Sequence, residues 1–198
     1  EGGTNEVPRA YFPSRTGCKV KLYQDAHTPA VPPVTDVTAT NGDGPYDPPC
    51  LWLDTVAAIE AAEKFVYVCG WAVWDELPLR RPKSGGLPDA AVDGEDTLYD
   101  LLTRKAQSGV RVCVMAWEEK FSCDVAPCGL MGTHDHTMRN RFNGTNSGVK
   151  VFLCPRQKRK AERMMESAWA ETTYTHHQKC VIVDAAPVEG SDSDKRRM

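Results

Sequence analysis

The run at residues 175–184, with the sequence THHQKCVIVD, constrains the fold of this chain more than any other segment. Its β-branched apolar residues predict a buried strand that ends at the acidic residue Asp184. Side chains alternate between the two faces of a strand, so His177 and Lys179 are expected to share one face and His176 to take the other. Asp184 has the wrong parity to lie beside His177 and is expected where the strand ends.

The spacing H-x-K-x(4)-D, formed by His177, Lys179 and Asp184, points to phosphoryl chemistry. An ammonium group binds phosphate oxygens, and an imidazole beside it can attack phosphorus or carry a proton. A lone histidine and lysine at a strand edge are more often structural, because short motifs match by chance. The complete pattern is more selective, since its intervening residues CVIV are all apolar. We therefore predict a phosphoryl-transfer site at this strand.

The rest of the chain alternates predicted strands with predicted helices, which favours an α/β fold with a mixed, mostly parallel sheet. Apolar strands are expected at residues 18–23, 65–70, 110–117 and 149–154. Helices are expected at residues 51–64, 97–108 and 136–142, with a charged helical connection at 157–173. Asp96 or Thr97 is the expected cap of the second helix. Proline and glycine predict irregular loops at residues 26–49 and 71–93.

Composition limits the partners and favours a reducing, cytoplasmic environment. The 24 basic and 27 acidic residues give a net charge of −3 (24 − 27), so no overall basic field draws the chain to nucleic acid. No apolar run approaches the roughly 20 residues that span a bilayer. Cysteines inside apolar strand-like runs are expected to stay reduced and behave as small buried hydrophobic residues. These are Cys69, Cys113, Cys154 and Cys180.

Further runs accompany the motif in a fixed order along the chain. They are YFP at residue 11, GCKV at 17, LYQDAH at 22, GW at 70, RPK at 81, GVRV at 109, GLM at 129, THD at 133 and LCPR at 153. Together with the motif they make the chain resemble the phospholipase D superfamily, and most closely its plant-type, calcium-dependent members. The matches are collinear from about Tyr11 to Asp184, which makes the resemblance specific.

The resemblance implies a phospholipase D-like α-β-α sandwich lobe, which is one half of a two-lobed catalytic region. Members of the family carry one H-x-K-x(4)-D motif in each half, and this sequence has one. We therefore expect residues 1–10 to be a linker remnant and residues 11–198 to be the first catalytic lobe, incomplete at its C-terminal end. We also expect this stretch of sequence to lack the calcium- and lipid-binding β-sandwich domain that precedes the catalytic region in plant-type members.

The resemblance also assigns roles to the motif residues. It implies that His177 attacks phosphorus to give a phosphohistidine intermediate and that Lys179 holds the phosphate. It implies that Asp184 orients or charge-balances the histidines. The histidine that protonates the leaving alcohol would come from the second half. The resemblance further implies Ca²⁺, for which Asp25 is a candidate ligand, although a turn-forming aspartate is an equal alternative because hard cations need several oxygens.

The function implied for the parent protein is hydrolysis of phosphatidylcholine-like phospholipids to phosphatidate and free head group, or transfer of the phosphatidyl group to an alcohol. The expected partners are a phospholipid at a membrane surface and a second catalytic half, with no nucleic acid, so the protein is expected to be cytoplasmic and peripherally membrane-associated. The chain alone is expected to be inactive. Two alternatives remain: a one-motif phosphodiesterase that works as a homodimer, and a truncated lipid-binding fragment without catalysis.

Other residues are weaker candidates. Glu118 and Glu119 end a parallel strand, where open α/β sheets place ligand sites, so both are candidates for a supporting role. Trp71 and Trp74 either line the lipid cleft or fill the core. A basic turn at residues 156–160 is more typical of a solvated surface than of a head-group site. A zinc site is disfavoured, because its candidate ligands fit no zinc spacing: Cys128, His134, Asp135 and His136.

Overall fold

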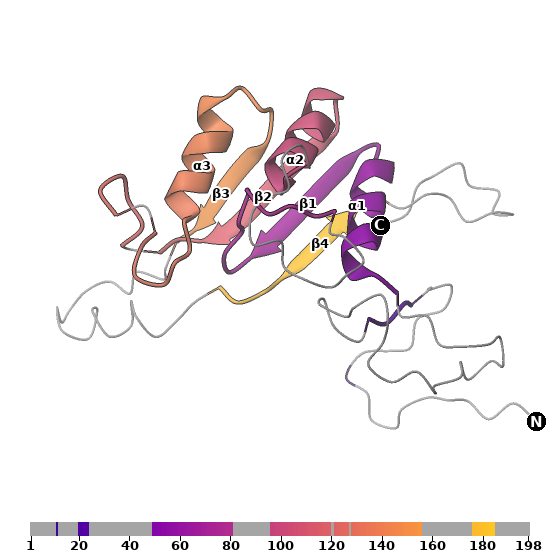
Figure 1. The fold of residues 1–198 in the computed structure, drawn as a ribbon, viewed down its shortest axis with the longest axis horizontal. Helices are drawn as coiled ribbons and strands as arrows, with labels where there is room; N and C mark the ends of the chain where they lie inside the picture. Colours follow the sequence, from indigo (N-terminus) through magenta and orange to yellow (C-terminus); the bar gives the residue numbers. More distant parts are fainter. Residues whose placement is uncertain are drawn as a thin grey trace, which may run out of the picture.

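The computed structural model describes residues 11, 20–23, 49–80, 96–119, 121–126, 128–155 and 176–184. Within them lies a mixed four-stranded sheet with the order β3-β2-β1-β4. The parallel strands are β1 (Phe65–Gly70), β2 (Arg111–Trp117) and β3 (Lys150–Cys154), and β4 (Cys180–Val183) is antiparallel to β1. The predicted α/β fold with a mostly parallel sheet is confirmed (Figure 1).

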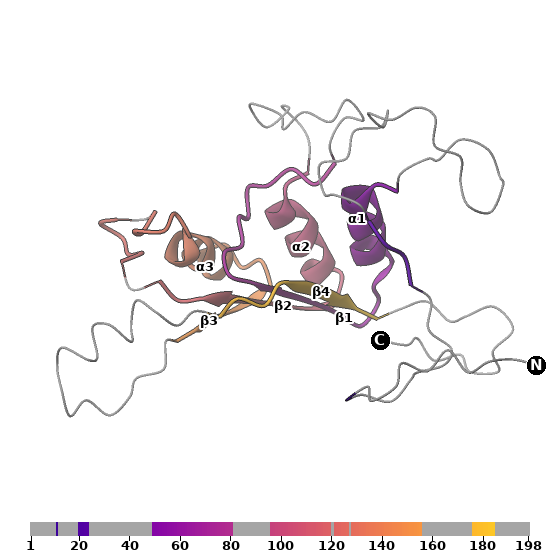
Figure 2. The ribbon, with the colours of Figure 1, turned by 90° about the horizontal axis from the view of Figure 1, so that it is seen from below.

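The described helices are α1 (Leu51–Ala61), α2 (Leu98–Gln107) and α3 (Asp135–Gly144). They lie side by side on one face of the sheet (Figure 2). Alternate strand residues point towards them, so Val66, Val112 and Val114 are almost completely buried. Apolar residues of the helices, including Ile59 and Leu102, complete this core. Burial of these side chains is the main contribution to the stability of the lobe.

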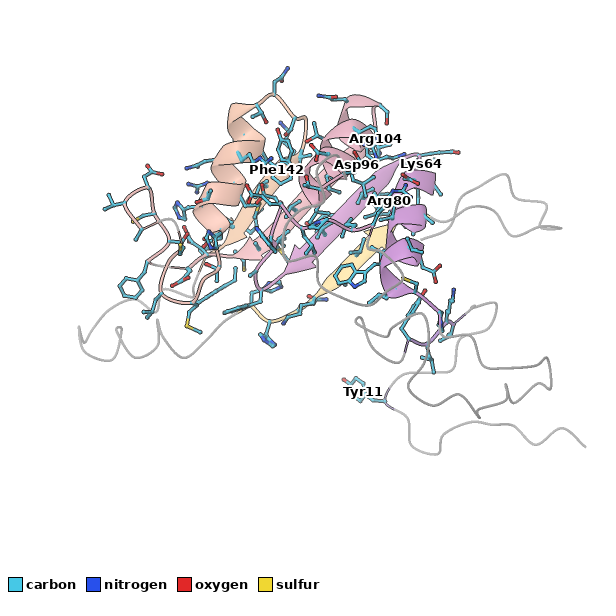
Figure 3. The ribbon with its side chains drawn as sticks, viewed as in Figure 1. Tyr11, Lys64, Arg80, Asp96, Arg104 and Phe142 are labelled. Atoms are coloured by element: carbon cyan, nitrogen blue, oxygen red, sulfur yellow. The ribbon has the colours of Figure 1, made fainter. Side chains whose placement is uncertain are left out.

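Helix α2 begins where the sequence predicts. Thr97 is its N-cap, and the Thr97 hydroxyl accepts a hydrogen bond from the Asp100 N–H while the Asp100 carboxylate accepts one from the Thr97 N–H. This reciprocal capping box satisfies two donors that a helix start otherwise leaves unpaired. Arg104 of the same helix forms an ion pair of 2.7 Å with Asp96. Nearby, Arg80 forms an ion pair of 2.6 Å with Glu60 of α1 (Figure 3).

Three predictions for individual elements differ from the structure. Helix α1 ends at Ala61 rather than at residue 64, because the backbone N–H groups of residues 63–65 donate hydrogen bonds to the carboxylate of Asp184. The predicted strand at 18–23 is absent from its described part, since residues 20–23 have no strand pairing. Strand β4 begins at Cys180, so His177 and Lys179 precede the strand instead of lying within it.

From Cys180 onward the predicted alternation holds, but the prediction of a buried strand is wrong. Strand β4 is at the edge of the described sheet, and Val181 and Ile182 are exposed. Val181 pairs with Val68, and Val183 pairs with Val66, on the face that carries the helices. Cys180 and Ile182 take the opposite face. The predicted linker at residues 1–10, residues 81–93 of the loop predicted at 71–93, and the connection at 157–173 lie outside the described residues.

Candidate active site

The carboxyl ends of the parallel strands meet at one edge of the sheet, and His177 lies at that edge. Because β4 is antiparallel to β1, its first residue, Cys180, pairs with Cys69 near the carboxyl end of β1. The residues just before β4 therefore reach the positions that follow β1 and β2. Open α/β sheets place their ligands at this edge, where loops rather than strands surround the site.

Two tryptophans form one wall beside His177. Trp71 follows β1 directly, and Trp117 ends β2. Their ring centroids are 5.8 Å apart with an interplanar angle of 15°, so the rings are stacked. The imidazole of His177 lies 6.4 Å from the Trp71 ring at a tilt of 58°. Offset and tilted ring pairs of this kind restrict side-chain rotation, so Trp71 limits the orientations open to the imidazole.

Lys179 lies next to His177 on the same exposed segment. Its Nζ donates a hydrogen bond of 3.1 Å to the backbone carbonyl oxygen of His177. This contact holds the ammonium group close to the backbone of His177, and both residues are exposed. A flexible, exposed ammonium beside an imidazole is chemically suited to an anionic phosphate that approaches from solvent. The structure thus brings these two predicted site residues together.

Asp184 lies at the other end of β4. Its carboxylate is 3% exposed and accepts hydrogen bonds of 3.0–3.1 Å from the backbone N–H groups of Glu63, Lys64 and Phe65. Glu63 and Lys64 precede β1 and Phe65 is its first residue, whereas His177 lies beyond the carboxyl end of β1. The two sites are separated by about 20 Å of strand, given a rise of about 3.3 Å per residue. Asp184 therefore does not contact the His177 imidazole, and its observed contacts hold the start of β1 against the end of β4.

Glu119 supports the loop beside the site. It follows β2, is buried, and its carboxylate accepts hydrogen bonds from the backbone N–H groups of Leu130 and Met131 and from the hydroxyl of Thr133. The backbone N–H of Glu119 in turn donates to the Asp135 carboxylate at 3.2 Å. The sequence made Glu119 a candidate for a supporting role, and in the structure its side chain holds a loop in place through these hydrogen bonds. They fold the segment after β2 back onto the strand that carries Trp117.

Gly129 makes this loop possible. Its φ angle is +66°, a left-handed conformation that favours glycine, and a Cβ atom there would lie 2.2 Å from Oε2 of Glu119. The carboxylate therefore occupies the space that a side chain would fill. The GLM run, which the sequence offered only as part of a resemblance, has this physical reason for its glycine.

Exposed apolar side chains surround the same edge. Trp74, three residues beyond Trp71, is 56% exposed. It therefore does not fill the core, which was one of the two roles considered for it. Leu130 is 72% exposed on the loop that Glu119 holds. The segment that carries Trp74 is held by helix α3, since Arg141 of that helix donates a hydrogen bond of 3.0 Å to the buried carboxylate of Asp75.

The weaker candidates are distributed as follows. Asp25 and the basic turn at 156–160 lie outside the described residues. The carboxylate of Asp135 is engaged by Thr133 and Glu119, and Nδ1 of His136 lies 3.1 Å from the Arg139 guanidinium. Over the part of the chain that the structure describes, no three histidine, cysteine or acidic side chains are grouped as metal ligands. Nor does any described helix have the length and apolar character needed to cross a bilayer.

An exposed histidine and lysine thus lie at the carboxyl edge of a mostly parallel sheet, which defines the class of this chain as an α/β lobe with candidate ligand-binding residues at that edge. Comparison with known proteins then specifies the family. The family model described as phospholipase D matches residues 58–198, which is more than half of the chain. The chain therefore belongs to the phospholipase D family, as the resemblance predicts.

Individual relatives agree with this assignment. The chain is 40% identical over 200 residues to phospholipase D alpha 2 of Brassica oleracea var. capitata and 39% identical over 199 residues to phospholipase D alpha 1 of Arabidopsis thaliana. Each match covers 97% of this chain and 23% of the relative. Phospholipase D alpha 1 of Zea mays is 39% identical over 193 residues. The chain spans about a quarter of the length of the curated relatives it matches.

Proposed function

We propose that this chain supplies the first catalytic half of a phospholipase D. The complete enzyme would hydrolyse phosphatidylcholine-like lipids to phosphatidate and free head group, or transfer the phosphatidyl group to an alcohol. The observation that carries the proposal is the position of His177, exposed beside Lys179 and Trp71 at the carboxyl edge of the sheet. Membership of the phospholipase D family supports the choice of substrate class.

The proposed first step is attack of the His177 imidazole on the phosphodiester phosphorus. The nitrogen–phosphorus bond forms as the bond from phosphorus to the head-group oxygen breaks, and a general acid protonates the departing alcohol. Lys179 offsets the negative charge on the non-bridging phosphate oxygens, which grows in the transition state. In the second step, water or another alcohol attacks phosphorus and releases His177.

Trp71 and Trp117 have a positioning role in this scheme. Their stacked rings form an apolar wall next to the imidazole, and Trp71 limits its rotation. A fixed imidazole loses less orientational freedom on reaching the phosphorus than a mobile one. Trp74 and Leu130, exposed on neighbouring loops, would contact the apolar part of a lipid.

The general acid has to come from a second motif, because this sequence contains one H-x-K-x(4)-D pattern. We favour a second half within a longer chain, since the relatives are about four times as long as this chain. A homodimer that pairs two copies of His177 is the alternative enzyme, and a lipid-binding fragment without turnover is the non-catalytic one. The described lobe alone would then be inactive or nearly so.

Calcium dependence and peripheral membrane binding are part of the proposal. The candidate ligand Asp25 lies outside the described residues, so the support for Ca²⁺ is the resemblance to calcium-dependent members. Calcium would assist binding to an anionic lipid surface, while the attack at phosphorus uses the side chains named above. Assays with added Ca²⁺ and with a chelator separate lipid binding from the attack at phosphorus. Only the calcium-assisted binding is expected to change with the lipid composition of the vesicles.

The test is choline release from phosphatidylcholine vesicles, with Ca²⁺ or with a chelator. The chain is assayed alone and mixed with the second catalytic half of a plant phospholipase D alpha, and each sample is repeated with His177→Ala and with the control His136→Ala. We expect release only in the mixture, lost in His177→Ala and kept in His136→Ala. Release by the chain alone, second order in protein, would instead establish the homodimer. No release from a mixture whose halves bind each other would contradict the proposal.

A further inference from the structure

The sheet face opposite the helices carries an unusual set of side chains. Val66 and Val68 of β1 point towards the helices, so Tyr67 and Cys69 point to the other face. Pairing with β1 places Cys113, Cys154 and Cys180 on this same face, along the neighbouring strands. All four are free thiols, and one pair among them stands out because its members occupy opposing positions.

Cys69 and Cys180 are that pair. They lie directly opposite each other in the antiparallel ladder of β1 and β4. Directly opposed residues in such a ladder have Cα atoms about 4.5 or 5.5 Å apart, depending on the hydrogen-bonding pattern. A disulfide needs a Cα separation of about 4.4–6.8 Å, so either pattern meets the requirement without movement of the backbone. Their side chains also share one face, which directs both sulfur atoms into the same space.

The other two thiols on the face lack such a partner. Cys113 lies opposite Tyr67 on one side and Lys150 on the other, and Cys154 lies opposite Trp117. Neither is directly opposed to a cysteine. Cys113 pairs with Lys150 of β3, and Cys154 lies four residues further along that strand, which corresponds to about 13 Å. The opposed pair is thus geometrically distinct on this face.

The two thiols differ in their surroundings. Cys69 is 8% exposed, whereas Cys180 is half-buried and lies at the first position of β4. Burial, together with a hydrogen bond to the Cys180 thiol, raises the pKa of the Cys69 thiol. Since the thiolate is the reactive form, Cys69 is the poorer initial nucleophile and Cys180 is the more accessible one. This difference gives the two residues separate roles in a two-step oxidation.

We propose that Cys69 and Cys180 form an oxidisable dithiol that closes to a disulfide when a peroxide reaches the half-buried Cys180 on the sheet face opposite the helices. The Cys180 sulfur attacks one peroxide oxygen, the O–O bond breaks, and a cysteine sulfenic acid and one water result. The Cys69 sulfur then attacks the Cys180 sulfur, the S–S bond forms, and the sulfenic oxygen leaves as a second water. Two thiols are oxidised by two electrons, and one hydrogen peroxide is reduced to two waters.

The position of the bond connects this modification to the candidate site. Cys69 is two residues before Trp71, and Cys180 follows Lys179 directly. A disulfide there joins the two elements that carry the site. A dithiol can reduce such a bond by thiol–disulfide exchange through a mixed disulfide, which begins with attack on the half-buried sulfur of Cys180. The modification is therefore reversible by a dithiol reductant.

The test maps the bond in the chain itself. Reduced protein is treated with hydrogen peroxide, remaining thiols are blocked with iodoacetamide, and tryptic peptides are analysed by mass spectrometry. We expect the peptide 65–80 joined to the peptide 180–195, lighter than the two free peptides by two hydrogen atoms and separated again by dithiothreitol. Cys113→Ser should retain this cross-link, and Cys180→Ser, at a half-buried position that tolerates the change, should abolish it.

Two results would overturn the proposal. One is full alkylation of both Cys69 and Cys180 at peroxide concentrations that oxidise the exposed Cys123 and Cys128. The other is a cross-link from Cys180 to a cysteine other than Cys69. Far-ultraviolet circular dichroism of each variant establishes that the sheet is intact before oxidation, so the loss of a cross-link reports on the thiols and not on unfolding.

Discussion

Replacing Asp184 with alanine should destabilise the lobe severely, although the residue does not contact the imidazole of the motif. Its buried carboxylate accepts from the backbone N–H groups of residues 63–65. Each hydrogen bond to a charged group contributes roughly 1.5–3 kcal/mol, which sets an upper range of about 4.5–9 kcal/mol for three donors. Two of the donor residues, Glu63 and Lys64, are exposed, and water can replace the carboxylate at their amides. We therefore expect a loss of about 3–5 kcal/mol in the free energy of unfolding.

Urea denaturation followed by far-ultraviolet circular dichroism at 25 °C measures this loss. Asp184→Asn should lose less, about 1–3 kcal/mol, because an amide oxygen still accepts but carries no charge. The matched control is Asp124→Ala, which removes an exposed carboxylate that accepts from the side chain of Asn140 and should change stability by less than about 0.5 kcal/mol. A loss below about 1 kcal/mol for Asp184→Ala would refute the structural role of this carboxylate.

Three further predictions follow from individual contacts. Gly129→Ala should cost about 1–3 kcal/mol more than Gly132→Ala in urea denaturation, because both have positive φ angles but only the former would press a Cβ against a buried carboxylate. The pKa of Asp100 is lowered, mainly by the hydroxyl of the threonine that caps α2, so its stabilisation is present above about pH 4 and lost as the pH falls through the lowered pKa. Asp100→Asn should accordingly be less stable than the parent at pH 6, with the gap closing towards pH 3; a gap independent of pH would contradict the assignment. A hydrogen bond to Asp54 raises the pKa of Tyr23 to about 12, and Asp54→Asn should return it towards about 10 in an NMR titration of ring carbons.

Local patterns predicted much of the fold because its signals are local. The apolar runs at residues 65–70 and 110–117 became β1 and β2 with no error larger than one residue, since their side chains are buried against neighbouring strands. The sequence offered Asp96 or Thr97 as the cap of α2, and the structure has Thr97 at that position. Each of these features depends on residues close together in the chain.

The errors arose where partners are distant in the sequence. The end of α1 depends on Asp184, about 120 positions away, and no helix propensity contains that contact. Strand β4 starts late because its pairing begins where Cys180 meets Cys69, and the apolar pattern alone cannot locate that meeting point. The chemical types in the motif identified His177 and Lys179 as candidates, while the wall formed by Trp71 required the sheet to be assembled first.

The central claim is that His177 forms a covalent bond to phosphorus. The most direct measurement is an acid-free quench of the complemented mixture during turnover of a short-chain phosphatidylcholine, followed by mass spectrometry of the peptide that contains residue 177. The account predicts a phosphatidyl adduct on that peptide, absent in His177→Ala and discharged by added water or alcohol. Turnover with an adduct only on the histidine of the second half would contradict it.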